Sequence, residues 1–214
     1  MKTPFTIEQF FEVFKTYNEG VFPIQLLIYI LALAAIFIAI KHYHYAGKII
    51  SFILSLLWFW MGIVYHFNYF TSINNAAWIF GGLFVLQGII FFVTGVLQNK
   101  LNFRFNSGIW GFTGALLIFF SLVIYPVISY INGHAYPSTP TFGLPCPTTI
   151  FTLGLICWVD KKLSPVVWII PVLWSVIGFW AAFSLGMTED ISLIVAGILT
   201  VILLTIKYKF TTVR

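Results

Sequence analysis

The sequence has very little charge. Of its 214 residues, only 8% are Asp, Glu, Lys or Arg, whereas 60% are hydrophobic and 20% are aromatic. A soluble domain carries about a quarter charged residues, so too few polar side chains remain here to cover a water-soluble globule. The composition excludes a soluble protein and is typical of a chain that lies in a bilayer.

Cysteine and recognisable motifs are also scarce. Cys146 and Cys157 are too few for a disulfide framework, and no Cys-x-x-Cys motif occurs. No hydrolase, nucleotide-binding or haem-attachment motif is present. The N-terminus lacks a basic segment followed directly by an apolar run, so we expect no cleavable signal peptide. The sequence therefore points to a retained membrane domain of unstated activity.

Long apolar runs occupy most of the chain. A spanning helix needs about 20 mostly apolar residues. Seven apolar segments, most of them close to this length, can be placed between residues 22 and 206. They are Phe22–Ile40, Ile49–Phe70, Ala76–Leu97, Ile109–Ile131, Pro147–Val159, Pro165–Leu185 and Ile191–Ile206. The sequence predicts an all-α polytopic membrane helix bundle with seven transmembrane helices, forming one integral domain over residues 1–214.

Basic residues fall in alternate connections between these segments. Nine of the 11 Lys and Arg residues lie on one side of the predicted bundle: Lys41, Lys48, Lys100, Arg104, Lys161, Lys162, Lys207, Lys209 and Arg214. The other side holds Lys2 and Lys15 with five of the six acidic residues. Because basic loops stay in the cytoplasm, we predict an N-terminus outside and a C-terminus inside. The bilayer is the expected partner, and nucleic acid is not.

Residues 4–17 are amphipathic and too short to span. Phenylalanines fall near helical spacing on one side and acidic residues on the other, while Thr6 and Gln9 fit a capping box. This pattern predicts a short helix lying in the membrane interface.

The connection before the fifth segment is rich in proline. Pro137, Pro140, Pro145 and Pro147 fall within 11 residues, which prevents a regular helix. The fifth segment has 13 residues, and as a helix it would cover about 20 Å of a hydrocarbon core about 30 Å thick. We therefore predict a Pro-rich re-entrant loop on the outer side, because irregular backbone at that depth must be buried in protein or line a wet cavity.

Histidine and cysteine gather near this loop. His66 closes the second segment, His134 begins the loop, and Cys146 lies at the start of the short fifth segment. At a rise of about 1.5 Å per helical residue, His66 and Cys146 would share a depth near the outer boundary, with His134 nearby. A thiolate with two imidazoles suits zinc or copper, and Glu19 or Asp190 would complete four ligands. The same residues alternatively fit a Cys nucleophile with a His base.

Other polar residues extend this candidate site. A small-molecule site on the outer side would use the ligand-binding residues His66, His134, Cys146, Asn68, Tyr136, Thr148 and Gln87. The simpler interpretation of Gln87 is a hydrogen bond between helices, and Thr148 fits a bond to the first helical turn. No charged residue lies in the middle of any segment, which argues against a pump or an ion-coupled transporter.

Several sequence blocks resemble a family of bacterial multi-pass membrane proteins of unknown function. The most specific block is Pro-Thr-Phe-Gly-Leu-Pro-Cys-Pro-Thr-Thr, beginning at Pro140, and Phe-Thr-x-Glu-Gln-Phe-Phe at Phe5–Phe11 also fits. Tyr65–His66 and Gln87–Gly88 belong to a third run of similar residues. The resemblance covers nearly the whole chain and implies a bacterial inner membrane, but no activity.

Three functional hypotheses follow. The first is a binding, transport or sensing protein with a recessed outer site for a soft metal ion or a small molecule. The second is a membrane-embedded enzyme that uses Cys146 or a metal-bound water. The third is a structural subunit of a membrane complex. The sequence favours the first hypothesis, because a purely structural subunit does not require a rigid loop that carries His and Cys. The sequence leaves the oligomeric state open.

Overall fold

The computed structural model describes residues 4–212, with side chains placed as far as Lys207. Regular structure in this range is helical, with two isolated β-bridges and no β-strand among the described residues. The side chains of Lys2, Lys209 and Arg214, which contribute to the predicted charge pattern, lie outside the described part. The all-α class predicted from the sequence is confirmed.

Every predicted apolar segment is helical. They correspond to α2 (Ile24–Lys41), α3 (Ala46–Phe59) continued by η1 (Trp60–Tyr69) and η2 (Phe70–Ser72), α4 (Ala77–Phe91) continued by η3 (Phe92–Leu97), α5 (Ile109–Phe119) continued by η4 (Phe120–Ile124) and α6 (Tyr125–Ile131), α7 (Pro145–Cys157), η5 (Pro165–Val167) followed by α8 (Ile169–Leu185), and α9 (Ile191–Thr212). In η1, η3 and η4 the hydrogen bonding widens to that of a π-helix, a departure that the apolar pattern did not predict.

Four of these helical segments are long and apolar enough to cross a membrane: Ile24–Lys41, Ala46–Ser72, Ala77–Leu97 and Ile109–Ile131. The apolar helices α7 and α8 are shorter, as is Ile191–Lys207, the part of α9 whose side chains are described. Large apolar side chains cover the outward faces, as on α2, where Leu26, Ile30 and Leu33 are each more than half exposed. This surface is compatible with a membrane protein.

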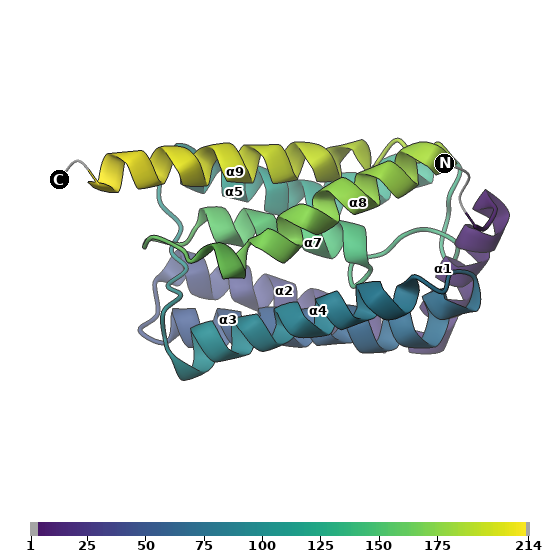
Figure 1. Ribbon diagram of the computed structural model, residues 1–214, viewed down its shortest axis with the longest axis horizontal. Helices are drawn as coiled ribbons and strands as arrows, with labels where there is room; N and C mark the ends of the chain where they lie inside the picture. Colours follow the sequence, from purple (N-terminus) through teal and green to yellow (C-terminus); the bar gives the residue numbers. More distant parts are fainter. Residues whose placement is uncertain (1–3, 213–214) are drawn as a thin grey trace.

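The short helix α7 lies inside the bundle. Figure 1 shows it in the middle, with α5 and α9 on one side and α2, α3 and α4 on the other. All of its residues except Cys146 are buried. Gly114 of α5 and Gly154 of α7 let these two helices approach so closely that a Cβ on either would lie within 2.8 Å of the other's backbone oxygen. Protein thus surrounds the shortest of the seven predicted apolar segments.

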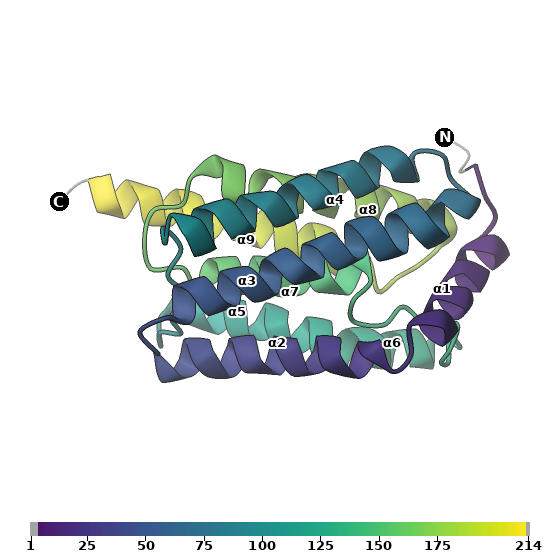
Figure 2. The ribbon, with the colours of Figure 1, turned by 90° about the horizontal axis from the view of Figure 1, so that it is seen from below.

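The N-terminal helix α1 (Ile7–Val21) crosses one end of the bundle (Figure 2). The predicted capping box is confirmed, since the Thr6 hydroxyl accepts from the Gln9 N–H at 3.3 Å and Gln9 Oε1 accepts from the Thr6 N–H at 2.9 Å. Val13, Phe14 and Tyr17 are buried against the bundle. On the predicted apolar side, Phe5 and Phe14 are buried, and Phe10 and Phe11 are partly buried against the same cluster.

The Pro-rich loop between α6 and α7 packs against α1 and α2. Asn18 Nδ2 donates to the carbonyl of Thr139 at 2.8 Å, and Gln25 Nε2 donates to Thr141 Oγ1 at 3.0 Å. At the end of the loop, the Gly143 N–H donates to Thr148 Oγ1 at 3.0 Å. These bonds satisfy a buried, irregular backbone, as a chain segment without helical hydrogen bonds requires.

Candidate binding cavity

A cavity of about 340 Å³ lies near the α1 end of the bundle. Its walls come from α1, η1, α4, α6, α7, α8 and the connections around them, and most lining side chains are apolar. Aromatic rings dominate, among them those of Phe10, Phe14, Tyr65, Phe70, Phe80 and Trp174. Trp180 and Ser184 line it and are exposed on α8, so it reaches the surface there. Its size lies within the range of about 300–1,000 Å³ typical of small-molecule sites.

His66 forms part of the cavity wall. Its side chain is fully buried, and neither Nδ1 nor Nε2 has a hydrogen-bond partner within the described structure. The imidazole centroid lies 4.8 Å from the ring of Phe84 and 5.4 Å from that of Trp174. The Trp174 indole Nε1 is likewise buried; it lies near the Cys146 thiol but forms no hydrogen bond of normal geometry within the described structure. The cavity wall therefore presents polar atoms whose hydrogen-bonding capacity the protein leaves unused.

The π-helical stretch η1 explains how His66 reaches the cavity. Tyr65, His66 and Phe70 line the cavity and are buried. Their spacing of four to five residues follows the wider turn of a π-helix rather than the 3.6-residue turn of an α-helix. Adjacent Tyr65 and His66 can then both face inward. π-Helical turns occur frequently at functional sites.

The cavity wall also contains Cys146 and Asp190. Asp190 is 2% exposed, and its Oδ1 accepts a hydrogen bond of 2.6 Å from the Tyr125 hydroxyl. The Cys146 thiol also interacts with this carboxyl group. Burial raises the pKa of Asp190 from an ordinary value of 3.8 to about 7, although the hydrogen bonds from Tyr125 and Cys146 partly oppose that rise. The cavity therefore includes an acid that can change charge near neutral pH.

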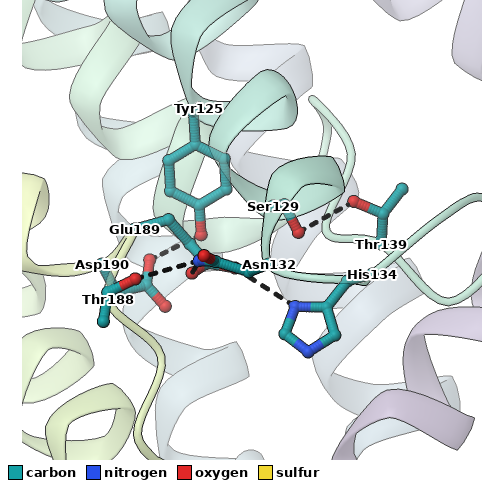
Figure 3. A network of polar contacts seen from close by, with 8 residues as sticks. All are labelled: Tyr125, Ser129, Asn132, His134, Thr139, Thr188, Glu189 and Asp190. Carbon is teal, nitrogen blue, oxygen red and sulfur yellow. Dashed lines mark hydrogen bonds and ion pairs between the residues drawn. The ribbon is translucent and has the colours of Figure 1, made fainter.

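A polar network continues from Asp190 toward the end of the bundle (Figure 3). The neighbouring Glu189 is also 2% exposed, and its Oε2 accepts from Asn132 Nδ2 at 3.1 Å. Its Oε1 lies 3.7 Å from Nδ1 of His134. The His134 ring also packs on Phe11 of α1, with centroids 4.0 Å apart and the ring planes tilted by 32°. His134 thus belongs to this network and is not among the residues that line the cavity.

The other predicted ligand-binding residues lie elsewhere. Asn68 is exposed beside a second, shallower pocket between α1 and η1. The Tyr136 hydroxyl donates to the Asn18 carbonyl at 3.2 Å, and Thr148 is held by the Gly143 N–H. Gln87 Nε2 donates to the Val167 carbonyl at 2.9 Å, which confirms the simpler interpretation of a bond between helical segments. Only His66 and Cys146 of the predicted set share the cavity.

The predicted metal site requires a correction. Sequence spacing grouped His66, His134, Cys146 and Glu19, but the structure does not gather them. Among residues 4–212, no group of three or more His, Cys, Asp or Glu side chains is placed to hold a metal ion. His134 is turned toward Glu189 and Phe11, and Glu19 is exposed on α1. The physical reason is that depth along a helix, the basis of the prediction, does not fix the direction in which a side chain points.

Sequence reasoning missed Trp174, Tyr65 and Tyr125 as cavity residues and considered Asp190 as a metal ligand or a helix cap, not as part of a small-molecule site. The signal for Asp190 was its position directly before an apolar helix, which the simplest interpretation assigns to a helix cap. Nothing in the sequence distinguishes Trp174 from the other seven tryptophans. These residues become candidates only because the fold brings them together around one cavity.

Comparison with known proteins places the chain in a family. The model of DUF6064, a family of unknown function, matches residues 7–214. The chain belongs to this family. No curated protein matches the chain, and no solved structure matches it. The DUF6064 match spans α1, the Pro-rich loop and every helix that lines the cavity, so the site lies within the family's domain apart from Pro4 and Phe5, which precede the match.

Proposed function

We propose that this DUF6064 protein is a seven-span protein of a bacterial inner membrane, with its N-terminus outside and its C-terminus in the cytoplasm. Support comes from the ends of the bundle. The α2–α3, α4–α5 and α7–α8 connections lie at the end that bears the C-terminus (Figures 1 and 2). These connections and their flanks carry Lys41, Lys48, Lys100, Arg104, Lys161 and Lys162. Basic loops are retained in the cytoplasm, and the bacterial setting rests on the resemblance of residues 140–152.

The short helix α7 is consistent with this topology. Its 13 residues would be too few to span a bilayer alone. Here it is enclosed by neighbouring helices, and the Pro-rich loop enters the bundle to meet it. Irregular backbone at membrane depth is tolerated in such surroundings.

We infer that the protein binds a small, largely apolar molecule in the cavity beside His66. The observation that carries this inference is the imidazole of His66, which is fully buried, lines the cavity and has two unpartnered nitrogens. A buried polar group without a partner destabilises a protein by about 1–3 kcal/mol. A ligand with a hydrogen-bonding group would remove this cost. We therefore propose that the outer end of the bundle binds this small molecule, and that the protein transports or senses it.

The other two hypotheses have less support. A Cys nucleophile paired with a His base needs the two side chains within hydrogen-bonding reach, yet Cys146 interacts with the Asp190 carboxyl and the Trp174 indole, and neither nitrogen of His66 has a partner in the described structure. A purely structural subunit would have no use for an open cavity with unused polar atoms in its wall. Ligand binding accounts for both the open cavity and the unused polar atoms in its wall.

Native mass spectrometry of the protein, released gently from its membrane, tests this function. We expect a small molecule bound to the wild type and lost from a His66→Phe variant, which keeps a ring but removes both nitrogens. His44→Phe is the matched control, since His44 is exposed at the opposite end. Equal occupancy in the wild type and His66→Phe, or an empty wild-type protein, would contradict the proposal.

A further inference from the structure

We propose that the molecule bound in this cavity is an organic ammonium ion carrying an apolar group, held by the aromatic wall and by the carboxylate of Asp190. This inference rests on the proposed binding function and names the chemical class of the ligand. It follows from two features of the same cavity, its ring-lined wall and its single unneutralised acid.

The first feature is the aromatic wall. Phe80 and Trp174 lie edge to face with centroids 5.4 Å apart, and Tyr65 stacks on Phe70 at 5.7 Å. All four rings line the cavity. Organic cations bind over ring faces within about 6 Å of the centroid, and aromatic cages of this kind recognise quaternary ammonium groups. The wall can therefore solvate a cation after water is lost.

The second feature is the acid. Asp190 lines the cavity and is buried, and its described partners, Tyr125 and Cys146, are uncharged hydrogen-bond donors. No Lys or Arg is among the described residues that line the cavity. A buried charge is normally paired with an opposite one. A cationic ligand supplies the opposite charge that this part of the chain does not.

The polar atoms of the wall are compatible with such a ligand. A nitrogen of His66 without a hydrogen can accept an N–H from a primary or secondary ammonium group. The carboxylate of Asp190 accepts a second hydrogen bond or pairs with a quaternary group by charge alone. An anionic ligand would instead lie beside the same-sign charge of Asp190.

A matched set of water-soluble ligands tests the charge preference. Trimethyl(phenethyl)ammonium, phenethyl alcohol and phenylacetate share one apolar group and differ in charge. Binding is followed at pH 8, where the Asp190 carboxyl is largely ionised, from the quenching of tryptophan fluorescence in detergent-purified full-length protein. The variants are Asp190→Asn, which retains an acceptor for Tyr125, and Glu189→Gln as the control, because the adjacent Glu189 bonds Asn132 rather than lining the cavity.

We expect the ammonium ligand to bind the wild type and Glu189→Gln alike, and Asp190→Asn to weaken it by about tenfold or more, as for loss of one partner from a buried charge pair. The alcohol should bind more weakly and be indifferent to Asp190→Asn. Binding of the alcohol or phenylacetate at least as tightly as the ammonium ion would overturn the ammonium assignment and leave the binding function standing. An ammonium affinity unchanged in Asp190→Asn would do the same. Absence of binding by all three would count against both proposals.

Discussion

Replacement of His66 by phenylalanine should make the empty protein more stable. In most buried positions the loss of a polar side chain removes hydrogen bonds, but His66 makes none through either ring nitrogen. Phenylalanine retains a flat ring among the aromatic neighbours Phe84 and Trp174. The extra volume of the larger ring can extend into the adjacent cavity, so the overpacking that penalises enlarged core residues is relieved.

The magnitude follows from the burial of the imidazole. Its exposed fraction is 0%, and an unsatisfied buried polar group costs about 1–3 kcal/mol. We therefore expect His66→Phe to raise the free energy of unfolding of ligand-free protein by about 1–3 kcal/mol. His66→Ala should lower it instead, because removal of a buried ring leaves a larger void.

Denaturant titration in mixed micelles, after extensive exchange to remove bound molecules, measures this difference. The wild type, His66→Phe and His66→Ala are compared at one detergent concentration. Stabilisation by phenylalanine together with loss of ligand would be the signature of a site that gives up stability for function. If His66→Phe instead destabilises the protein as much as His66→Ala does, the imidazole nitrogens are satisfied within the protein and the reasoning fails.

Three further predictions address packing, charge and topology. Gly154→Ala should destabilise the protein by about 1–3 kcal/mol, because its Cβ would meet a backbone oxygen of α5 at 2.8 Å, whereas Gly82→Ala, with no atom within 4 Å, should be neutral or stabilising in the same unfolding titration. Because the pKa of Asp190 is raised in the folded protein, its contribution to stability is complete below about pH 4 and is lost as the pH rises through about 7. The free energy of unfolding should therefore fall between pH 5 and 8 in the wild type and fall less in Asp190→Asn. An equal fall in both proteins would refute the raised pKa of Asp190. A membrane-impermeant maleimide should label Asn75→Cys in intact cells but Tyr43→Cys only after lysis, and the reverse pattern would invert the proposed topology.

Much of the helical framework could be predicted from the sequence. Apolar runs and their boundaries depend on local composition, so α2, α4 and α9 begin within two residues of their predicted starts. The capping box at Thr6 and Gln9 is local as well, and it forms as predicted. Such features require no knowledge of which helices are neighbours.

The site was less predictable because it depends on side-chain direction. His66 and Cys146 were expected at one depth, and they do line one cavity, but His134 at the start of the same loop turns away toward Glu189. The π-helical turn that brings both Tyr65 and His66 inward leaves no mark on an apolar sequence. Helix contacts over long sequence separations decide these directions, as for Asp190 and Tyr125, which are 65 residues apart.

An experimental density map of the protein prepared from its native membrane would test the central claim most directly. The account predicts density for a small molecule in the cavity between His66 and Trp174, with one of its polar atoms within hydrogen-bonding distance of an imidazole nitrogen. A cavity closed by rearranged side chains, with His66 bonded to another residue of the chain, would contradict it.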